Sequence, residues 1–429
     1  MAEEIPKSKW KRGLTGTKTV AKMGQKALKY LAMKPFLAEE KRVHAKKTLN
    51  RETAEVLFQG LSLLRGTALK IAQFLSMELD IFPPEVTREL QKSYHQAPPI
   101  NRALVRKIIH NVLGNPPEQI FQAFDTVAFA AASLGQVHRA TTRDGNRLAV
   151  KIQYPGIRDT IQSDVQLLRS VLRCLPEYQA ILPAIEEIEA RLIEETNYRI
   201  EAQNMTFFKE RLCLDQIVVP AFYSDLSADT VLSAGYMNGM TLNEWLRTEP
   251  DQKDKDRVAQ ALNDLFIFGL YRLNCIHADP NPGNFIVNGD CKIGLVDFGC
   301  VKRFDPEFVG LYGELSQTAL CEDQDHYMRL SRALRTEGSD ISPELERRTF
   351  KVFYETGQWL GKLYREECFD FKANPGFIAT GKKIIVRAFE MGHMDFNTNF
   401  VFLHRTRYGL LRLFEQMGAR VCFRNPYEC

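Results

Sequence analysis

The sequence predicts an α+β fold in which a small mixed part of strands and helices lies between longer helical stretches. Helical spacing of apolar residues dominates up to about residue 118 and again beyond residue 236. Between them, the runs GQVHRAT and RLAVKIQY lie on either side of Asp144-Gly145, which is the pattern of a β-hairpin. A second pair of short strands is expected over residues 284–299, NFIVNGDCKIGLVDFG, around Asn288-Gly289-Asp290.

Prolines mark the ends of helices expected before the hairpin. The spacing of apolar residues predicts helices over 17–37, 52–80, 84–94 and 102–113. Pro83-Pro84 and Pro116-Pro117 are expected to end two of them, because proline removes a backbone donor and restricts the residue before it. After the hairpin we expect helices over 157–175 and 184–211, with short strands at 217–220 and 230–233.

Composition narrows the class of protein. The chain has 429 residues, of which 45% are hydrophobic and 26% charged, as in ordinary globular proteins. No apolar run approaches the roughly 18 residues that cross a bilayer, and the opening MAEEIPKSKWKRG lacks the apolar core of a signal peptide. The nine cysteines contain no C-x-x-C pair, which predicts reduced thiols, without a disulfide framework or a zinc site. We therefore expect a cytoplasmic protein that is not secreted and has no transmembrane helix.

The charge is unevenly distributed along the chain. Residues 1–51 carry 14 Lys and Arg against 4 Asp and Glu, whereas the remaining residues carry 43 against 49. Such a basic segment favours an anionic partner, and the helix expected over 17–37 is amphipathic enough for peripheral contact with an anionic membrane. A solvated helix packed on the rest of the protein is the alternative, with about equal weight. Nucleic acid is not expected, because no aromatic-interleaved basic patch accompanies the charge.

Lys151 is the first of four features that together predict a nucleotide site. It lies in Ala149-Val150-Lys151, on the second strand of the expected hairpin. In protein kinases a lysine on such a strand neutralises the α- and β-phosphates and pairs with a glutamate on a helix. Taken alone, Lys151 would be better explained as a lysine exposed on a strand edge.

Two separated segments follow the spacing of kinase catalytic motifs. His277, Asp279 and Asn284 match the pattern H-R-D-x-x-x-x-N, in which the aspartate accepts the proton of the acceptor hydroxyl and the asparagine binds a metal ion. Asp297-Phe298-Gly299 follows the strand-like KIGLV, and a carboxylate there would hold Mg²⁺. Each segment alone fits an ordinary turn. The two together predict a kinase-type active site.

The fourth feature is a helix expected over 191–210, which carries Glu195 and Glu201. At 100° per residue these glutamates would lie roughly 120° apart around one helix. One of them would then point toward Lys151 and the other toward a metal ion. Acidic residues on a helix are usually only solvated, so this interpretation depends on the other three features.

The segment expected to cover the phosphates, residues 130–136, is rich in alanine rather than glycine. Alanine keeps the loop small but lacks glycine's freedom to adopt positive φ. The backbone is therefore expected to hold phosphates differently from that of an ordinary protein kinase. The patterns GxxxxGK[ST], GxSxG and HExxH are absent, which argues against P-loop enzymes, serine hydrolases and zinc proteases.

In five ordered blocks the chain resembles the UbiB/ADCK family of atypical kinases, which is linked to ubiquinone biosynthesis. The blocks are FAAASLGQVHRA (129–140), AVKIQYPGI (149–157), EETNYRIEA (194–202), HADPNPGN (277–284) and VDFG (296–299). The resemblance implies a bilobal protein-kinase-like fold with a small mixed β/α N-lobe, a mainly helical C-lobe and an extra N-terminal helical element. The implied divisions are a basic extension (1–50), the helical element (51–118), the N-lobe with a helical insertion (119–235) and the C-lobe (236–429).

By position, the resemblance also implies a set of site residues. The implied catalytic residues are Asp279, Lys151 and its helical partner Glu201. The implied metal ligands are Asn284, Asp297 and Glu195. The implied nucleotide contacts are Ala130, Ala131, Ala132, Ser133, Lys151, Tyr236, Lys70 and Gln73, the last two resembling the family's K-x-G-Q signature. ATP and Mg²⁺ are the implied cofactors, whereas His138 is expected to be a packed strand histidine.

Three positions depart from the family's motifs. Ala72 replaces the glycine of K-x-G-Q, Asn197 replaces the aspartate of E-x-D, and Asn281 replaces a second histidine in the catalytic loop. The leading interpretation is an ATP- and Mg²⁺-dependent atypical kinase or ATPase that supports quinone or lipid metabolism, with a lipid or quinone as a further ligand. The alternatives are a nucleotide-binding, pseudokinase-like regulator and an ATP-driven lipid or quinone chaperone.

Overall fold

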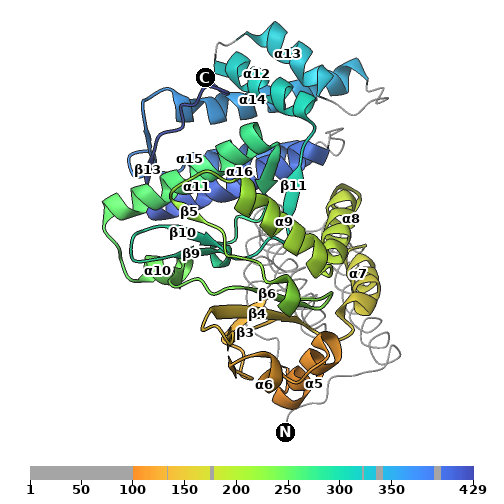
Figure 1. Ribbon diagram of the computed structural model, residues 1–429. Coiled ribbons are helices and arrows are strands. Elements are labelled where there is room, and N and C mark those ends of the chain that lie inside the picture. The colour runs from red at the N-terminus through yellow and green to blue at the C-terminus, as the bar shows by residue number, and fades with distance from the viewer. Residues whose placement is uncertain (1–99, 133, 174–177, 321–322, 335–341, 391–397) are drawn as a thin grey trace, which may run out of the picture. The chain divides into compact units, whose positions relative to one another are not determined.

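The computed structural model describes residues 100–429, apart from 133, 174–177, 321–322, 335–341 and 391–397 (Figure 1). The helices expected over 17–37, 52–80 and 84–94 lie outside the described residues. The chain divides into two compact units. Unit 1 comprises the chain up to Tyr198 together with Tyr223–Ser233, and unit 2 comprises Arg199–Phe222 and Ala234–Cys429. Both contain helices and strands, as the predicted α+β class requires.

A small antiparallel sheet forms the centre of unit 1. Its strand order is β1-β3-β4-β6, and β2 pairs with β3. The bounds are Ala123–Phe124 for β1, Ala130–Ala132 for β2, Gly135–Thr141 for β3, Arg147–Gln153 for β4 and Val231–Gly235 for β6. Strands β3 and β4 form the predicted hairpin, and Gly145 in its turn has a φ of 84°. The turn lies at Asp144-Gly145 because glycine adopts this left-handed conformation without strain.

Helix α5 (Arg102–Leu113) covers one face of this sheet and confirms the helix predicted there. Asn101 caps its start by accepting a hydrogen bond from the backbone N–H of Ala103 at 2.8 Å, and Gly114 ends it in the left-handed region. A buried core lies between α5 and the sheet. It contains Val105 and Ile109 of α5, the alternate β4 residues Leu148, Val150 and Ile152, and also Phe121 and Val231. The short helix α6 (Pro117–Ile120) leads into β1.

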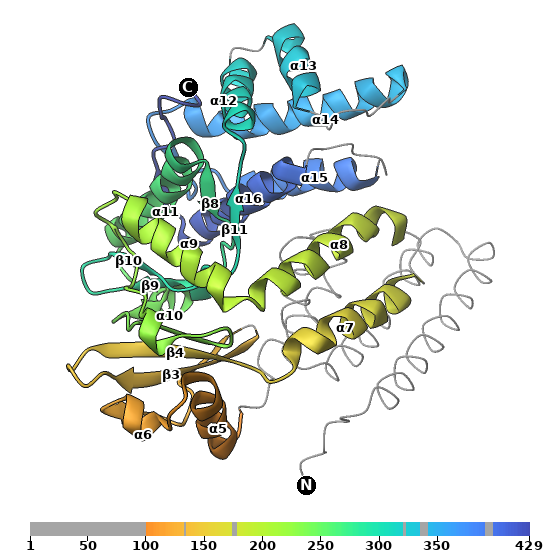
Figure 2. The same ribbon diagram turned by 45° about the vertical axis from the view of Figure 1, so that its right-hand side comes forward.

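Two long helices, α7 (Ile157–Leu172) and α8 (Tyr178–Glu195), pack against each other in unit 1 (Figure 2). The next helix, α9, spans Tyr198–Arg211. The single helix expected over 184–211 is therefore wrong, since Thr196 and Asn197 interrupt it. The side-chain amide of Gln153 on β4 donates to the carbonyl of Thr196 at 3.0 Å, which satisfies a backbone group left without a helical partner.

Unit 2 contains a four-stranded sheet with the order β5-β10-β9-β7. The bounds are Ile217–Val218 for β5, Met240–Thr241 for β7, Phe285–Val287 for β9 and Ile293–Leu295 for β10. Strands β9 and β10 are the short pair predicted within 284–299. Asn288 shapes their turn, because its side-chain oxygen accepts from the backbone N–H groups of Asp290 and Lys292 at 3.0 and 2.9 Å.

The sequence did not predict a second strand pair in unit 2. Strand β8 (Cys275–His277) pairs antiparallel with β11 (Val301–Arg303), so that His277 lies opposite Val301. Each strand has only three residues, too few to show an alternating pattern. Because of this pairing, the segment that begins after β8 lies next to the segment that ends at β11.

Besides α9, the part of unit 2 that the structure describes contains seven further α-helices. They are α10 (Leu242–Arg247), α11 (Gln252–Leu273), α12 (Pro306–Leu320), α13 (Gln324–Ala333), α14 (Pro343–Gly361), α15 (Phe377–Glu390) and α16 (Thr398–Met417). Helices α11 and α16 lie side by side (Figures 1 and 2). Among the described residues, none of the helices is both long and apolar enough to cross a membrane.

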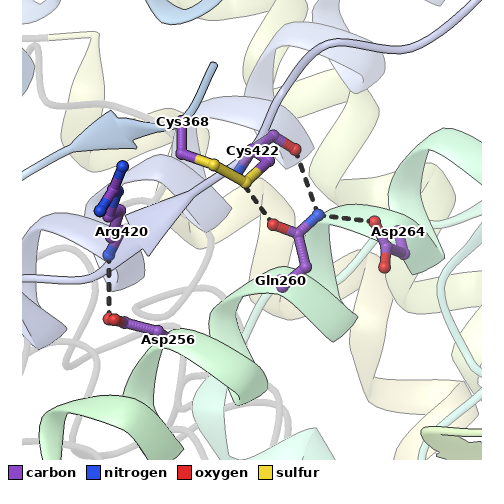
Figure 3. The surroundings of a disulfide bond; sticks show 6 residues. All are labelled: Asp256, Gln260, Asp264, Cys368, Arg420 and Cys422. Carbon is purple, nitrogen blue, oxygen red and sulfur yellow. Dashed lines mark hydrogen bonds between the residues drawn. A yellow bond between two sulfur atoms is a disulfide. The ribbon is translucent and has the colours of Figure 1, made fainter. Parts of the chain in front are cut away.

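A disulfide bond between Cys368 and Cys422 holds the C-terminal tail, which we define as residues 418–429 (Figure 3). The expectation of reduced thiols is therefore wrong for this pair. Strands β12 (Phe369–Asp370) and β13 (Arg420–Val421) pair antiparallel, which brings the two cysteines opposite each other. Their separation of 54 residues gives no local signal in the sequence. The pairing of the strands creates the contact.

Helix α11 also binds the tail through a row of polar side chains (Figure 3). Three residues one helical turn apart bond to backbone groups of alternate tail residues: Gln252 with Gly418, Asp256 with Arg420, and Gln260 with Cys422. Figure 3 shows the second and third of these pairs. Four residues of a helix rise about 6 Å, and two residues of a strand rise about 6.6 Å. The two repeats nearly match, so a helix can bind an extended segment in register.

Near its end, the tail is held by a buried ion pair. Arg407 of α16 donates to both carboxylate oxygens of Glu428, each at 2.8 Å, and Glu428 is fully buried. The hydroxyl of Tyr271 donates to the same carboxylate at 2.8 Å, and Tyr364 also contacts it. Burial alone would raise the pKa of Glu428, but the Arg407 guanidinium and the hydrogen bonds from Tyr364 and Tyr271 together outweigh burial and lower that pKa. Both groups are therefore charged at neutral pH.

Replacing Glu428 with glutamine is expected to lower the free energy of unfolding by about 3–5 kcal/mol, because Arg407 would keep a buried charge without its counter-ion. Urea unfolding of the full chain, followed by circular dichroism, measures this loss. Glu366 is exposed, so Glu366→Gln provides a matched control with little effect. Equal stability of the two variants would contradict a structural role for the ion pair.

Candidate functional site

Lys151 lies on β4, where it is half-buried and opposite Val137 of β3. Strand β4 runs between β3 and β6, so the alternative of a lysine on an edge strand is wrong. The Lys151 ammonium lies 5.2 Å from the centre of the Tyr198 ring, which is almost fully buried at the start of α9. A cation over an aromatic face is held at a defined position. Unit 1 thus presents a positive charge on its central sheet, beside the Tyr198 ring.

The alanine-rich segment is a hairpin rather than the loop that the sequence predicted. Ala130–Ala132 form strand β2, which pairs with the start of β3, and Ala130 and Ala131 are exposed. A side chain in place of Gly135 would bring its Cβ to 2.2 Å from the carbonyl oxygen of Ile152, so glycine is required for the close approach of β3 to β4. Alanine lacks glycine's backbone freedom. The alanine residues therefore adopt an ordinary strand conformation and pair with β3 instead of forming an irregular loop.

A chain of hydrogen bonds through two buried side chains of β3, Gln136 and His138, ties this strand to neighbouring backbone groups. The backbone N–H of Ile100 donates to Gln136 Oε1 at 2.8 Å, so the Gln136 amide nitrogen donates to Nε2 of His138, also at 2.8 Å. Nδ1 of His138 then carries the proton and donates to the carbonyl of Asp125 at 2.8 Å. Burial lowers the pKa of His138, which agrees with this neutral form. The expectation of a packed strand histidine is confirmed, and Gln136 is its missed partner.

In unit 2, Asp279 and Asn284 lie on the loop between β8 and β9, and both are buried. The side-chain nitrogen of Asn284 donates to Oδ2 of Asp279 at 2.9 Å. Asn281 Oδ1 accepts from the backbone N–H of Gly283 at 2.9 Å and begins the 3₁₀ turn Pro282–Asn284. The loop therefore has a defined shape, and the residue that departs from the family's histidine stabilises its turn.

Asp297 is tied directly to this loop. Nε2 of His277 donates to the backbone carbonyl of Asp297 at 2.5 Å, and the backbone N–H of Val296 donates to the carbonyl of Asn284 at 3.2 Å. The Asp297 carboxylate accepts from the backbone N–H of Gly299 at 2.9 Å, which orients it. The two motifs that the sequence placed in separate segments thus form one hydrogen-bonded group.

Helix α9 is anchored to the same group. Glu201 is buried in its first turn, and the Asn204 side chain donates to the carbonyl of Phe298 at 3.2 Å. Phe298 is fully buried, and its ring packs against Phe208 of α9 and against His277, each at 5.7 Å between centroids. Sequence reasoning missed Asn204. Its spacing with Glu201 and Phe208 places all three on one helix face, which was the available signal.

The other residues predicted for the site lie in both units or outside the described residues. Glu195 is buried at the end of α8 in unit 1, on a different helix from Glu201, so the 120° relation predicted for one shared helix is wrong. Tyr236 is half-buried just after β6 in unit 2. Lys70, Gln73 and Ser133 lie outside the described residues. The Lys151–Glu201 pairing joins residues of different units and stays a prediction.

The donors that unit 2 brings together suit a hard cation. Asp297 offers carboxylate oxygens and Asn284 an amide oxygen, which are ligands that Mg²⁺ accepts while phosphates and water complete its shell. Over the part of the chain that the structure describes, no three His, Cys, Asp or Glu side chains form a metal-binding group. A cavity of about 30 Å³ lies among α12, α14 and α16, and none of the predicted site residues lines it.

Comparison with known proteins identifies the family. The model of the ABC1 atypical kinase-like domain matches residues 92–331, more than half of the chain. The chain is 31% identical over 330 residues to a probable serine/threonine-protein kinase, abkA, of Dictyostelium discoideum, covering 73% of this chain and 58% of that protein. It is 32% identical over 293 residues to the mitochondrial atypical kinase COQ8B of Rattus norvegicus, covering 67% and 55%. The chain thus spans little more than half the length of these relatives.

A solved structure shows the same fold. In the structure titled as the complex of Rv3197 with erythromycin from Mycobacterium tuberculosis, the protein superposes with a TM-score of 0.60 at 24% identity, covering 90% of this chain and 96% of that one. At that identity the match concerns the fold alone. The family-model match and the named kinases among the relatives identify the family. The chain belongs to the ABC1 family of atypical kinases, which is the UbiB/ADCK family.

Proposed function

We propose that the protein binds ATP with Mg²⁺ and transfers or hydrolyses the terminal phosphoryl group. The observation that carries this proposal is the hydrogen-bonded group of unit 2. In it, Asp279 accepts from Asn284, and the Asp297 carbonyl accepts from His277. These are the catalytic-loop and metal-binding positions of a kinase. Their connection within one unit supports a shared role.

Each residue has a role in the proposed mechanism. Asp279 accepts the proton of the attacking hydroxyl or water, and its bond to Asn284 orients the carboxylate for this. Asn284 and Asp297 would hold Mg²⁺, and the ion would supply positive charge to neutralise the phosphates. Lys151 contributes a positive charge for the α- and β-phosphates, and Glu201 is proposed as its partner. Glu195 is proposed as a further metal ligand.

A nucleotide-binding regulator without turnover is the second candidate. Asn281 carries no charge, and its side-chain oxygen is engaged with the backbone of Gly283. It therefore supplies no cation near the terminal phosphate, where protein kinases usually carry a lysine. Weak stabilisation of the transition state would follow, while nucleotide binding would persist. This candidate shares the binding site of the first and differs in turnover.

Quinone or lipid metabolism is the proposed setting of the reaction, either as a kinase or as an ATP-driven lipid or quinone chaperone. This proposal rests on the UbiB/ADCK family and its link to ubiquinone biosynthesis. The acceptor is left open, because the chain spans little more than half the length of the relatives it matches. A cytoplasmic location with peripheral membrane contact is proposed on the charge of residues 1–51.

Asp297→Asn is expected to weaken Mg²⁺-dependent ATP binding at least about tenfold, because it removes the charged metal ligand while keeping the shape of the side chain. Calorimetric titration of the full chain with ATP, with and without Mg²⁺, measures the change. Asp290 is exposed in the turn between β9 and β10, and Asp290→Asn makes the same change of charge as a control. Unchanged Mg²⁺-ATP affinity in Asp297→Asn would remove the metal assignment.

Asp279→Asn is expected to reduce ATP turnover by about 10²–10⁴-fold and to leave nucleotide affinity nearly intact, because the amide cannot accept the proton. Phosphate release from Mg²⁺-ATP, measured beside nucleotide binding, separates the two effects. Measurable wild-type turnover that survives in the variant would exclude Asp279 as the base. Tight metal-dependent binding without turnover in the wild type would favour the regulator.

Removing residues 1–48 is expected to weaken binding to vesicles that contain phosphatidylserine, because this segment is strongly basic whereas the rest of the chain has an excess of acidic residues. Sedimentation at low and high salt should show a salt-sensitive loss of binding, with nucleotide affinity unchanged. Neutral phosphatidylcholine vesicles serve as the control. Equal binding of both chains to anionic vesicles would contradict a membrane role for this segment.

A further inference from the structure

Helix α16 contacts the catalytic loop at a position where only glycine fits. A Cβ added at Gly409 would lie 2.4 Å from Cγ and 3.0 Å from Cβ of Pro280. Pro280 is buried and directly follows Asp279 in the chain. Its ring closes onto its own backbone nitrogen and fixes φ, so the ring cannot move aside without moving the loop. Any displacement of Pro280 is therefore passed to Asp279.

Helix α16 is itself held firmly around Gly409. Arg407, two residues earlier, makes the buried pair with Glu428 of the tail. Its guanidinium also lies 5.8 Å from the centre of the Phe266 ring on α11. Earlier on α16, Lys302 of β11 lies over the Phe402 ring at 5.0 Å. The helix is thus fixed to the tail, to α11 and to the strand that follows Asp297.

The tail has its own attachments, which are independent of the catalytic loop. The polar row on α11 binds its backbone over alternate residues, and the Cys368–Cys422 disulfide fastens it to β12 (Figure 3). Side chains in a packed interior that contact each other closely transmit displacement instead of absorbing it. A continuous set of contacts therefore runs from the tail through α16 to Pro280.

We propose that Gly409 is a positioning residue for Asp279, and that the C-terminal tail keeps α16 in the place where this contact forms. The proposal rests on the proposed function for the role of Asp279. The contact between Gly409 and Pro280 sets where the loop lies, and the Arg407–Glu428 pair sets where α16 lies. Neither Gly409 nor the tail belongs to the motifs that predicted the active site.

A second glycine provides a matched control. A Cβ at Gly381 of α15 would lie 2.3 Å from the Trp359 ring of α14, a clash of the same size within the same unit. Neither residue belongs to the catalytic loop. Gly381→Ala should therefore disturb packing as much as Gly409→Ala does, without moving Asp279.

Four variants of the full chain test the contact: Gly409→Ala, Gly381→Ala, Pro280→Ala, and Gly409→Ala combined with Pro280→Ala. Misplacement of a catalytic group by about 1 Å costs up to 10²-fold in rate. We expect Gly409→Ala to lower kcat for Mg²⁺-ATP turnover at least about tenfold, with KM within about twofold. Gly381→Ala should keep the wild-type kcat. Removing the proline ring makes room for the new methyl group, so the double variant should match Pro280→Ala alone.

Hydrogen–deuterium exchange of the amides of residues 278–284 reads the same contact without turnover. Faster exchange in Gly409→Ala and in Glu428→Gln, but not in Gly381→Ala, is the expected result. Unchanged exchange in Gly409→Ala would overturn the proposal, and unchanged exchange in Glu428→Gln would overturn the role of the tail. If the wild type shows no turnover, the catalytic form of the proposed function fails, while the exchange still decides the positioning.

Discussion

The hydrogen bond from His277 to the carbonyl of Asp297 is the interaction on which the candidate site of unit 2 depends. The pairing of β8 with β11 brings the two segments to neighbouring points, and this bond then fixes one to the other. It joins the strand that leads to the Asp279–Asn284 pair to the backbone of Asp297. In the proposed mechanism, a proton acceptor and a metal-bound phosphate would have to lie at a set distance, and a connection of this kind would maintain that distance.

The supports of this group come from two sides of unit 2. Asn204 and Phe208 of α9 contact the backbone and the ring of Phe298, respectively. On α16, Gly409 has no side chain, so the helix can pack closely against Pro280. Active-site loops gain precision when rigid elements hold them. The short loop between β8 and β9, which is proposed as the catalytic loop, gains that rigidity from helices distant in the sequence.

Local sequence patterns predicted the elements that depend on neighbours in the chain. The β3–β4 hairpin, the β9–β10 pair and α5 follow from turn residues, alternation and capping. The interruption between α8 and α9 was missed, because it is stabilised by Gln153, a residue over forty positions earlier. The Cys368–Cys422 disulfide was missed for the same reason, since it forms only after β12 and β13 pair.

The candidate site shows the same division. Motif spacing placed Lys151 on a strand and predicted that Asp279, Asn284 and Asp297 act together, and unit 2 connects these three through hydrogen bonds. The contribution of Gly409 has no signature in the sequence. A glycine on a helix becomes meaningful only when its neighbour is known, and here that neighbour is a proline more than a hundred residues earlier.

The central claim is that Asn284 and Asp297 hold the metal ion of a bound nucleotide. Manganese in place of magnesium tests it directly, because the paramagnetic ion broadens the resonances of nearby amides. On addition of Mn²⁺ with ATP to the isotope-labelled full chain, the account predicts broadening at residues 284 and 297 and sharp signals along α14. Broadening elsewhere in unit 2, with residues 284 and 297 unaffected, would contradict it.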